Sequence, residues 1–383
     1  MTRQQQIEAL LVELRSRRHG LMNQSVCIGF DGYIDRIVHA VKQRSTPENY
    51  TRFHTIAEYA NHLQACAGRS GDIEIVPVTE EVGGNAPIMA QAMARLGVPS
   101  TCVGTLGEYE IHPVFSNLSH FFNPQSIGKP ASTLAIEFSD GKIMLGEIEP
   151  LHQVTWEHIK HQLGIQKIAE FFQSSRCFGI VNWSSIYAMD GILRGIIEEV
   201  FPLLGDELAE KFVFVDIADP SARSRHDILN LAAILKELNT KAKVVLGLNR
   251  KEAGIVYESL GYVDQDQPQE VWAQAIVQDI ELHGVVIHSS NRVTGILAGV
   301  LGETDVFHLE NPARTTGVGD HFNAGFCTGL LLNLSLLQCL HLGNLTASSF
   351  LTTGQSPSFD DLLALGECGN PNNEKEVLAN ESV

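Results

Sequence analysis

RCFGIVNW (residues 176–183) is the first of four short apolar runs, which continue with FVFVDIAD (212–219), AKVVLGLN (242–249) and GVVIHSS (284–290). Each run has the length of one buried strand, and the intervals between runs are long enough for helices. Strands that alternate with helices pair in parallel, because each crossover returns the chain to the same edge of the sheet. The sequence therefore predicts an α/β fold with a doubly wound, mainly parallel sheet and flanking helices.

The N-terminal third adds strands of two kinds. SVCIGFDGYID (25–35) contains an apolar run, and we expect it to be a buried strand that delivers Asp31 and Asp35 to the edge of the sheet. TCVGTLG (101–107) predicts a further strand. The strand-like segments 34–41, 73–81 and 131–148 fall outside the alternation, and Asp140-Gly141 supplies a turn within the last of them. We expect a small β-sheet lid formed by segments of about 34–82 and 131–148, which also offers a contact for a homodimer.

The ends of the chain differ from this central region. Ile7, Leu10, Leu11 and Leu14 recur at helical spacing and predict an N-terminal amphipathic helix within residues 1–20. Residues 21–368 then form the α/β domain with its lid. A second hairpin is expected from 295–300 and 304–309. The polar segment 369–383 is expected to be disordered.

The amino-acid composition disfavours some classes of binding partner and indicates the compartment. The formal net charge of -18 opposes binding to nucleic acids or to anionic membranes. The seven cysteines are widely spaced and contain no C-x-x-C, which predicts a reducing compartment without a disulfide framework. No window approaches the roughly twenty apolar residues of a membrane span, and no signal peptide precedes the domain. We therefore expect a cytoplasmic protein.

The segment Thr315-Thr316-Gly317-Val318-Gly319-Asp320 precedes a long apolar helix. Glycines at a helix start allow successive N–H groups to converge on an anion, and the helix dipole favours phosphate there. A carboxylate in the first turn then suits removal of a proton from an attacking hydroxyl. The alternative is an aspartate that only stabilises the helix start.

Two further segments strengthen the phosphate interpretation. Gly83-Gly84-Asn85 opens another helix, which ends at Leu96-Gly97. Asn249 and Glu252 follow a buried strand and could both face one point, where they would organise magnesium through water. Asn followed by Glu three residues later is equally the pattern of a capping box, which remains the alternative.

Taken together, these segments resemble the signatures of a known family. Gly83 to Gly97 is similar to the N-terminal signature of the ribokinase-like, phosphofructokinase-B superfamily of carbohydrate kinases. Thr315 to Gly325 is similar to its C-terminal signature, and Asn249-x-x-Glu252 to its magnesium-organising motif. The order and separation of the three also match, so the resemblance covers about residues 25–365.

The resemblance implies ATP as co-substrate, Mg²⁺ as cofactor and a sugar bound between the lid and the sheet edge. It implies that Asp320 is the base and that Gly317, Val318 and Gly319 form the anion hole. The remaining roles that it implies fall into three groups. They are substrate contacts (Asp35, with Asp31 as its rival, and Gly83, Gly84 and Asn85), nucleotide or phosphate contacts (Asn249, Thr316 and Asn344) and magnesium contacts through water (Glu252 and Asp219). For Asp219, a turn before Pro220 is the alternative.

The chain also departs from the family pattern. Arg314 stands where members often have an aspartate that helps to bind an activating monovalent cation, so K⁺ activation is in doubt. Arg314 either supplies its own charge near phosphate or forms a surface salt bridge. Ile88 replaces a second asparagine, and His321 follows the base where small residues are common.

The resulting prediction is ATP-dependent phosphorylation of a hydroxyl on a sugar or sugar-like substrate. A nucleoside kinase and an ADP-dependent sugar kinase on the same fold are alternatives. A non-catalytic sugar- or nucleotide-binding regulatory protein is a third alternative, against which the intact Asp320 and its glycines argue. A nicotinamide oxidoreductase is disfavoured, because no G-x-G-x-x-G follows the first strand.

Overall fold

A nine-stranded sheet forms the centre of the molecule. The computed structural model describes residues 2–368 apart from 117, 265, 308, 310 and 311, so the predicted disordered tail 369–383 lies outside the described residues. The sheet order is β14-β13-β12-β11-β10-β9-β1-β5-β6. The strands are β1 (Val26–Phe30), β5 (Ser100–Gly104), β6 (Phe122–Ser126), β9 (Cys177–Ile180), β10 (Phe212–Asp216), β11 (Lys243–Asn249), β12 (Gly284–His288), β13 (Arg292–Leu297) and β14 (Val300–Asp305).

The strands from β12 to β6 pair in parallel, which confirms the predicted α/β sheet. β13 and β14 add an antiparallel hairpin at one edge. This hairpin lies a few residues earlier than 295–300 and 304–309, because the chain turns at Ala298 and Gly299. Both residues have positive φ, 50° and 78°, and an alanine rarely adopts that conformation.

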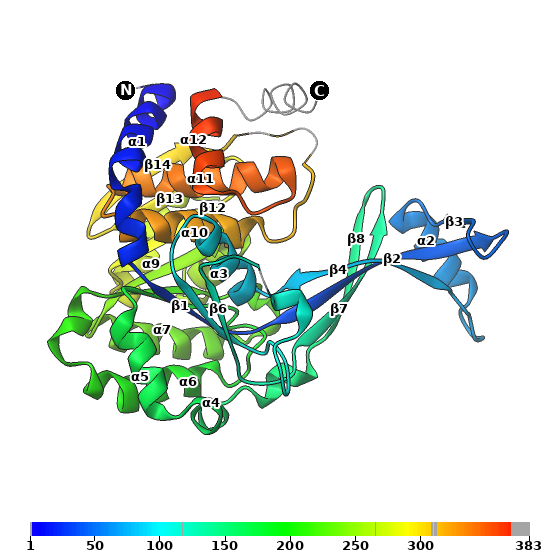
Figure 1. The fold of residues 1–383 in the computed structure, drawn as a ribbon, viewed down its shortest axis with the longest axis horizontal. Coiled ribbons are helices and arrows are strands. Elements are labelled where there is room, and N and C mark those ends of the chain that lie inside the picture. The colour runs from blue at the N-terminus through cyan, green and yellow to red at the C-terminus, as the bar shows by residue number, and fades with distance from the viewer. Residues whose placement is uncertain (1, 117, 265, 308, 310–311, 369–383) are drawn as a thin grey trace.

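Helices cover both faces of this sheet, so each face has its own apolar core (Figure 1). Buried strands are apolar on both sides because both sides are covered. One layer contains α4 (Trp156–Leu163), α5 (Ile165–Ser174), α6 (Met189–Gly195), α7 (Arg225–Asn239), α8 (Arg250–Ser259) and α9 (Gln269–Ile280). The other contains α1 (Arg3–Arg17), α3 (Asn85–Arg95), α10 (Val318–Leu331), α11 (Leu336–Thr353) and α12 (Phe359–Cys368).

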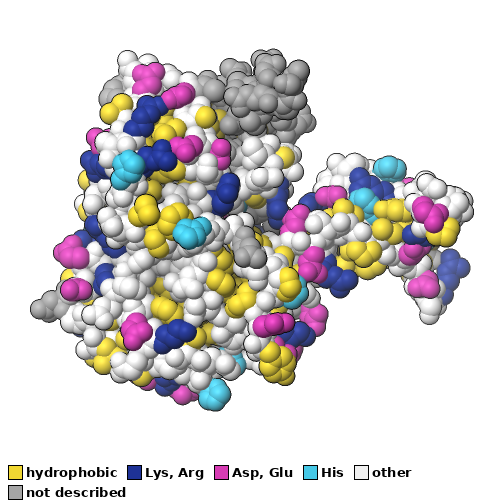
Figure 2. Space-filling model, in the orientation of Figure 1, with side chains coloured by type: hydrophobic (Ala, Val, Ile, Leu, Met, Phe, Trp, Pro, Cys, Tyr) yellow, Lys and Arg dark blue, Asp and Glu magenta, His cyan; other side chains and the backbone are white. Residues whose placement is uncertain are grey.

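A second, five-stranded sheet projects from the body as an arm (Figures 1 and 2). Its core contains Val38, Phe53, Tyr59, Ile136 and Phe138, separate from the cores of the main sheet. The segments predicted to lie outside the main sheet do so, and the Asp140-Gly141 turn joins the last two strands. The arm consists of β2 (Tyr33–Arg44), β3 (Tyr50–Arg52), β4 (Ile75–Gly83), β7 (Ala131–Phe138), β8 (Gly141–Glu147) and α2 (Ile56–Ala65).

Two further observations bear on the expectations from composition. No helix in the described part of the chain is long and apolar enough to cross a bilayer. The six cysteines whose side chains are described are all free thiols, and five of them are buried.

The N-terminal helix α1 packs on the body through its apolar stripe. Leu10 and Leu14 are fully buried, and Val12 on the opposite side is 64% exposed. The Leu10→Ala variant should therefore lose about 2–5 kcal/mol of free energy of unfolding, the usual effect of a cavity in a packed core. Chemical denaturation measures this loss. Val12→Ala is the matched control, with an expected change within about 0.5 kcal/mol. Equal effects of the two substitutions would show that α1 does not dock in this way.

Candidate active site

The polar site lies at the carboxyl ends of neighbouring parallel strands. Asp31 follows β1, Asn182 follows β9, Asp216 ends β10 and Asn249 ends β11. Parallel strands with crossover helices bring such residues to one edge of the sheet, which is where α/β proteins bind ligands. The apolar runs that predict the strands therefore also bring these polar residues together.

Asp31 is a fully buried carboxylate held by three donors. The backbone N–H groups of Asn85 and Ala86 donate to it at 2.9 and 2.8 Å, and the side-chain amide of Asn182 donates at 2.7 Å. Burial nevertheless raises the pKa of Asp31 to about 6. This carboxylate anchors the first turn of α3 to the end of β1.

Asp320 lies in the first turn of α10, and the side-chain amide of Asn85 donates to it at 2.8 Å. Asn85 thus contacts Asp31 through its backbone and Asp320 through its side chain. Burial raises the pKa of Asp320 well above its usual value, and the neighbouring charges of Asp216, Asp31 and Glu252 act in the same direction. The predicted base and the predicted substrate-contacting asparagine are therefore direct neighbours.

The helix start before Asp320 has the geometry expected of an anion site. Gly317 is the N-cap residue of α10 with a φ of 88°, a left-handed conformation that glycine adopts without strain. The first N–H groups of an α-helix have no partner within the helix, so they can bind an anion, and the helix dipole adds to the attraction. The neutral ring of His321 donates from Nδ1 to the carbonyl of Gly317 at 2.7 Å and accepts from the Ser356 hydroxyl at 2.8 Å. His321 thereby ties this turn to the segment after α11.

Asn249 and Glu252 form the capping box that the sequence left as an alternative. Glu252 accepts from the backbone N–H of Asn249 at 2.7 Å and from its side-chain amide at 2.5 Å. Burial raises the pKa of Glu252 to about 8, and Asp216 is the next cause. Asp216 in turn accepts from the side-chain amide of Asn323 at 2.7 Å.

The buried acids fit a bound cation. Asp31, Asp216, Glu252 and Asp320 are each at most 7% exposed, and each accepts a hydrogen bond from a neutral side-chain amide. Because burial raises the pKa of all four, a bound cation would favour their ionised forms. Among the residues that the structure describes, no three His, Cys, Asp or Glu side chains form a direct metal cluster. Contact with Mg²⁺ through water and phosphate oxygens, which Mg²⁺ favours, suits this arrangement. Asp219 lies at the rim of the site, where it pairs with Lys251 at 2.7 Å. Its side chain also accepts from the backbone N–H of Ser221, which is the turn at Pro220 that the sequence offered as the alternative to a magnesium contact.

The structure corrects the position of Asp35. It does not end the first strand, because β1 stops at Phe30 and the chain enters the arm at Tyr33, so that Asp35 lies inside β2. The glycine pair places both acids beside the start of α3. A side chain at Gly83 would meet Asp35 at 2.4 Å, and one at Gly84, which has a φ of 91°, would meet Asp31 at 3.0 Å. Asp31 is the acid that shares Asn85 with Asp320.

A cavity of about 600 Å³ lies on the outer side of the α10 start. Thr315, Val318 and Gly319 form one wall, and Asn249 and Asn344 line it as well. Its apolar lining includes Phe307 and Phe322. Thr316 was predicted to contact the nucleotide or its phosphates together with Asn249 and Asn344. It lines a different cavity, of about 440 Å³, with Arg314 and His321. The loop before α10 therefore separates two cavities.

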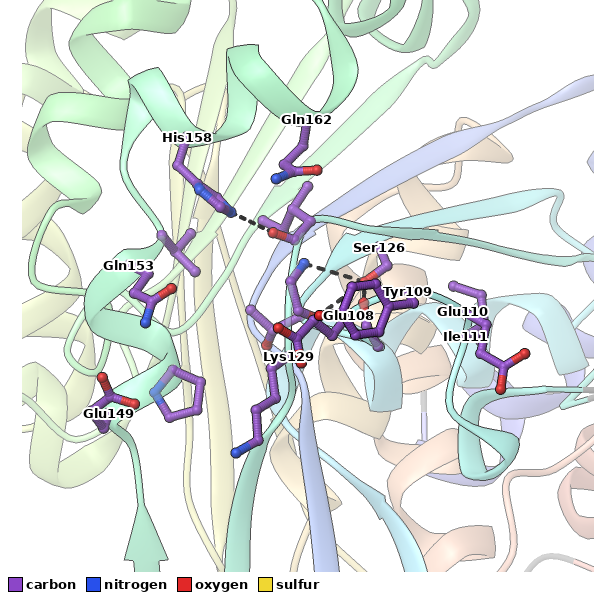
Figure 3. Close-up of a pocket in the computed structure, with 16 residues that line it drawn as sticks. Glu108, Tyr109, Glu110, Ile111, Ser126, Lys129, Glu149, Gln153, His158 and Gln162 are labelled. Carbon is purple, nitrogen blue, oxygen red and sulfur yellow. Dashed lines mark hydrogen bonds between the residues drawn. The ribbon is translucent and has the colours of Figure 1, made fainter.

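A third cavity, of about 480 Å³, lies beyond the ends of β5 and β6 and contains none of the predicted site residues. Figure 3 shows Lys129, Glu149, Gln153 and His158 around it. His158 contacts the carbonyl of Ile127 at 2.6 Å. This cavity adjoins the point where the chain leaves β6 for the arm.

Three polar residues at the site were not predicted from the sequence. Asn182 donates a hydrogen bond to Asp31, and Asn323 donates one to Asp216. The third residue is Asp216 itself, which the sequence indicated only as part of the end of a strand. A signal existed for Asn182 and Asp216, because each follows or ends an apolar run in the same way as Asp31. Asn323 lies within an apolar helix and has no such signal.

The fold and the site define a class of protein. The chain aligns with a probable sugar kinase protein from Rhizobium etli with a TM-score of 0.61 and 17% identity, covering 91% of this chain and 99% of that one. It aligns with a putative ribokinase II from E. coli, in complex with ATP and Mg²⁺, with a TM-score of 0.58 and 12% identity, covering 88% and 97%. These similarities confirm the ribokinase-like fold with its small β-sheet lid.

Comparison with known sequences identifies the family within this class of protein. A ketohexokinase from Haloferax volcanii is 28% identical over 341 residues, which are 88% of this chain and 90% of that protein. The family model for prokaryotic ketohexokinase matches residues 8–367. The protein is a carbohydrate kinase, a phosphotransferase with an alcohol group as acceptor. Within that class, the chain belongs to the prokaryotic ketohexokinase family.

The raised pKa of Asp31 predicts a specific pH dependence of stability. The folded state keeps the proton of Asp31 up to about pH 6, whereas the usual value is 3.8, so this group favours folding at low pH and loses that contribution as the pH rises through 6. Between about pH 4.5 and about pH 7.5, the wild-type free energy of unfolding should fall by about 2 kcal/mol more than that of Asp31→Asn. Denaturant titrations at both pH values measure this difference.

The exposed Asp360 provides the control for this comparison. Asp360→Asn removes an exposed carboxylate that pairs with Arg18 at the surface and should change the free energy of unfolding only slightly. A constant offset between wild type and Asp31→Asn would contradict the assignment of a raised pKa to Asp31.

Proposed function

We propose that this protein transfers the γ-phosphoryl group of ATP to a hydroxyl of a ketohexose, giving ADP and a ketohexose phosphate. The observation that carries this proposal is the position of Asp320. It is buried in the first turn of α10, shares Asn85 with Asp31, and directly follows Gly319, which lines the cavity of about 600 Å³. The name of the matched family and of the Haloferax volcanii relative supports a ketohexose as acceptor.

Asp320 accepts the proton of the attacking sugar hydroxyl, whose oxygen then bonds to the γ-phosphorus as the bond to ADP breaks. A base with a raised pKa suits this role near neutral pH. The backbone N–H groups at Gly317, Val318 and Gly319 bind the negative charge of the transferring group, which is the usual form of catalysis in phosphoryl transfer. His321 keeps the carbonyl of Gly317 turned away from that anion.

ATP occupies the cavity of about 600 Å³, and the sugar lies on the side of Asp31 and the arm. Asn249 and Asn344 contact the nucleotide or its phosphates, and the arm supplies Asp35 to the sugar. The backbone that faces the sugar is formed by Gly83, Gly84 and Asn85. Glu252 and Asp219 are the residues that would hold Mg²⁺ through water. When bound, the ion neutralises phosphate charge that would otherwise face the buried acids.

A coupled assay for nucleotide turnover tests this function and its alternatives. The panel contains ketohexoses, aldohexoses, pentoses and nucleosides, each with ATP and with ADP as donor. We expect the highest kcat/KM for a ketohexose with Mg·ATP. Preference for a nucleoside acceptor or for ADP would replace the proposal with the corresponding alternative.

The Asp320→Asn variant should lose about a hundred- to ten-thousand-fold in kcat, because general-base catalysis contributes that much. Asn keeps the shape of the side chain, so binding of nucleotide and sugar, measured by calorimetry, should change little. Asp360→Asn at the exposed end of α12 is the matched control and should retain wild-type kcat. Near-wild-type turnover by folded Asp320→Asn would disprove the role of the base.

K⁺ should have little effect on the rate. Arg314 stands where a cation-binding carboxylate is expected, and a guanidinium carries a permanent positive charge and has no lone pair to offer. The structure places Arg314 on Glu81 at 2.7 Å, with 23% of its side chain exposed. Replacing K⁺ with tetramethylammonium at constant ionic strength should therefore leave kcat unchanged. Saturable activation by K⁺ alone would contradict this prediction.

A further inference from the structure

We propose that the Arg314–Glu81 ion pair is a positioning device that couples the arm to the anion-hole loop. This inference rests on the proposed function, because it assigns the pair a role in aligning the sugar with the transferring phosphoryl group. Arg314 is three residues before Gly317, and Glu81 is two residues before Gly83. The pair therefore joins the two glycine-rich helix starts of the site across the junction between body and arm.

The ion pair is partly shielded from solvent. The Nη1 atom of Arg314 lies 2.7 Å from Oε2 of Glu81, and the two side chains are only 23% and 32% exposed. Figure 2 shows basic and acidic side chains close together where the arm leaves the body. The one other ion pair between arm and body in the described part of the chain is His112–Glu80 at 3.9 Å, which requires a protonated imidazole. The Arg314 pair differs from it in having a guanidinium, which stays charged at any ordinary pH.

On the arm, Glu81 lies directly opposite Asp35 in the antiparallel pairing of β4 with β2. Opposed residues point to the same face of a sheet, so Arg314 faces both acids. Burial raises the pKa of Asp35, while a hydrogen bond from Thr133 and the positive charge of Arg314 act in the opposite direction. Arg314 therefore favours the ionised form of the acid that the arm offers to the sugar.

On the body, the loop that carries Arg314 is fixed at several points. The backbone N–H of Ala313 donates to the carbonyl of Leu351 at 2.7 Å, and the guanidinium of Arg314 lies 5.7 Å from the centre of the Phe350 ring. The same ring stacks on His321 at 3.7 Å, and His321 holds the carbonyl of Gly317. A displacement of Glu81 is therefore passed to the turn that binds the phosphoryl group.

Kinetics of neutralised variants test the coupling. Arg314→Gln and Glu81→Gln should each raise the KM for the sugar and lower kcat, with kcat/KM reduced roughly tenfold, and should leave the KM for ATP unchanged. The double variant should be no worse than either single variant, because both substitutions break one interaction. Arg314→Lys, which keeps the charge, should recover part of the loss. Multiplied effects in the double variant, or an unchanged KM for the sugar, would overturn the proposal.

Hydrogen exchange tests the same pair without turnover. Backbone amides of β4 should exchange faster in Arg314→Gln and Glu81→Gln, and to the same extent in both. Arg292→Gln is the control, because Arg292 forms ion pairs at 3.7 and 3.6 Å with Glu303 and Asp305 within the hairpin of the main sheet and does not join the arm to the body. Unchanged exchange in β4 would refute the coupling even if no sugar were phosphorylated, whereas a failure of the substrate panel alone would refute only the proposed function.

Discussion

Four buried carboxylates, each of which accepts a hydrogen bond from the side-chain amide of an asparagine, are the constraint on which the rest of the structure depends. Asp31 pairs with Asn182, Asp216 with Asn323, Glu252 with Asn249 and Asp320 with Asn85. Burying an ionised acid without partners is very unfavourable, and a lysine or arginine partner would cancel its charge. A side-chain amide satisfies the oxygen and leaves the charge in place. The fold thus gathers four acids at one place, and burial first, followed by the charges of the neighbouring acids, raises the pKa values of Asp320 and Glu252.

The nine-stranded sheet makes this arrangement possible. Its parallel strands bring the ends of β1, β9, β10 and β11 to one edge, and α3 and α10 begin at the same edge with their amide-rich first turns. The two helical layers keep the strands rigid, so the acids cannot separate to relieve their repulsion. The loop before α10 separates the cavity lined by Asn249 and Asn344 from the cavity lined by Arg314.

Much of this could be predicted from the sequence, because the apolar runs and glycine pairs act locally. The parallel sheet, the separate smaller sheet and the α10 start all follow from them, whereas the hydrogen bond between Asn85 and Asp320 appears only in the structure. Asp35 was expected at the end of the first strand, although the segment 34–41 was also predicted to lie in the smaller sheet, and the structure places Asp35 in that smaller sheet. The second hairpin was shifted because Ala298 adopts a positive φ. The contact between Arg314 and Glu81 joins residues 233 positions apart and depends on how the arm meets the body, which no local pattern encodes.

The separate core of the arm has an entropic consequence. Phe53, Tyr59 and Phe138 pack against one another within the arm, so its strands are already ordered before any ligand arrives. Ordering a flexible loop costs about 1–2 kcal/mol per residue in backbone entropy alone, and a loop of this length would consume most of the binding energy of a small sugar. A prefolded arm avoids that cost, because closing it over a ligand would restrict only the few residues at its base. In the proposed function, the small hydrophobic cluster of the arm would therefore leave the binding energy of the sugar available for alignment of the reacting hydroxyl.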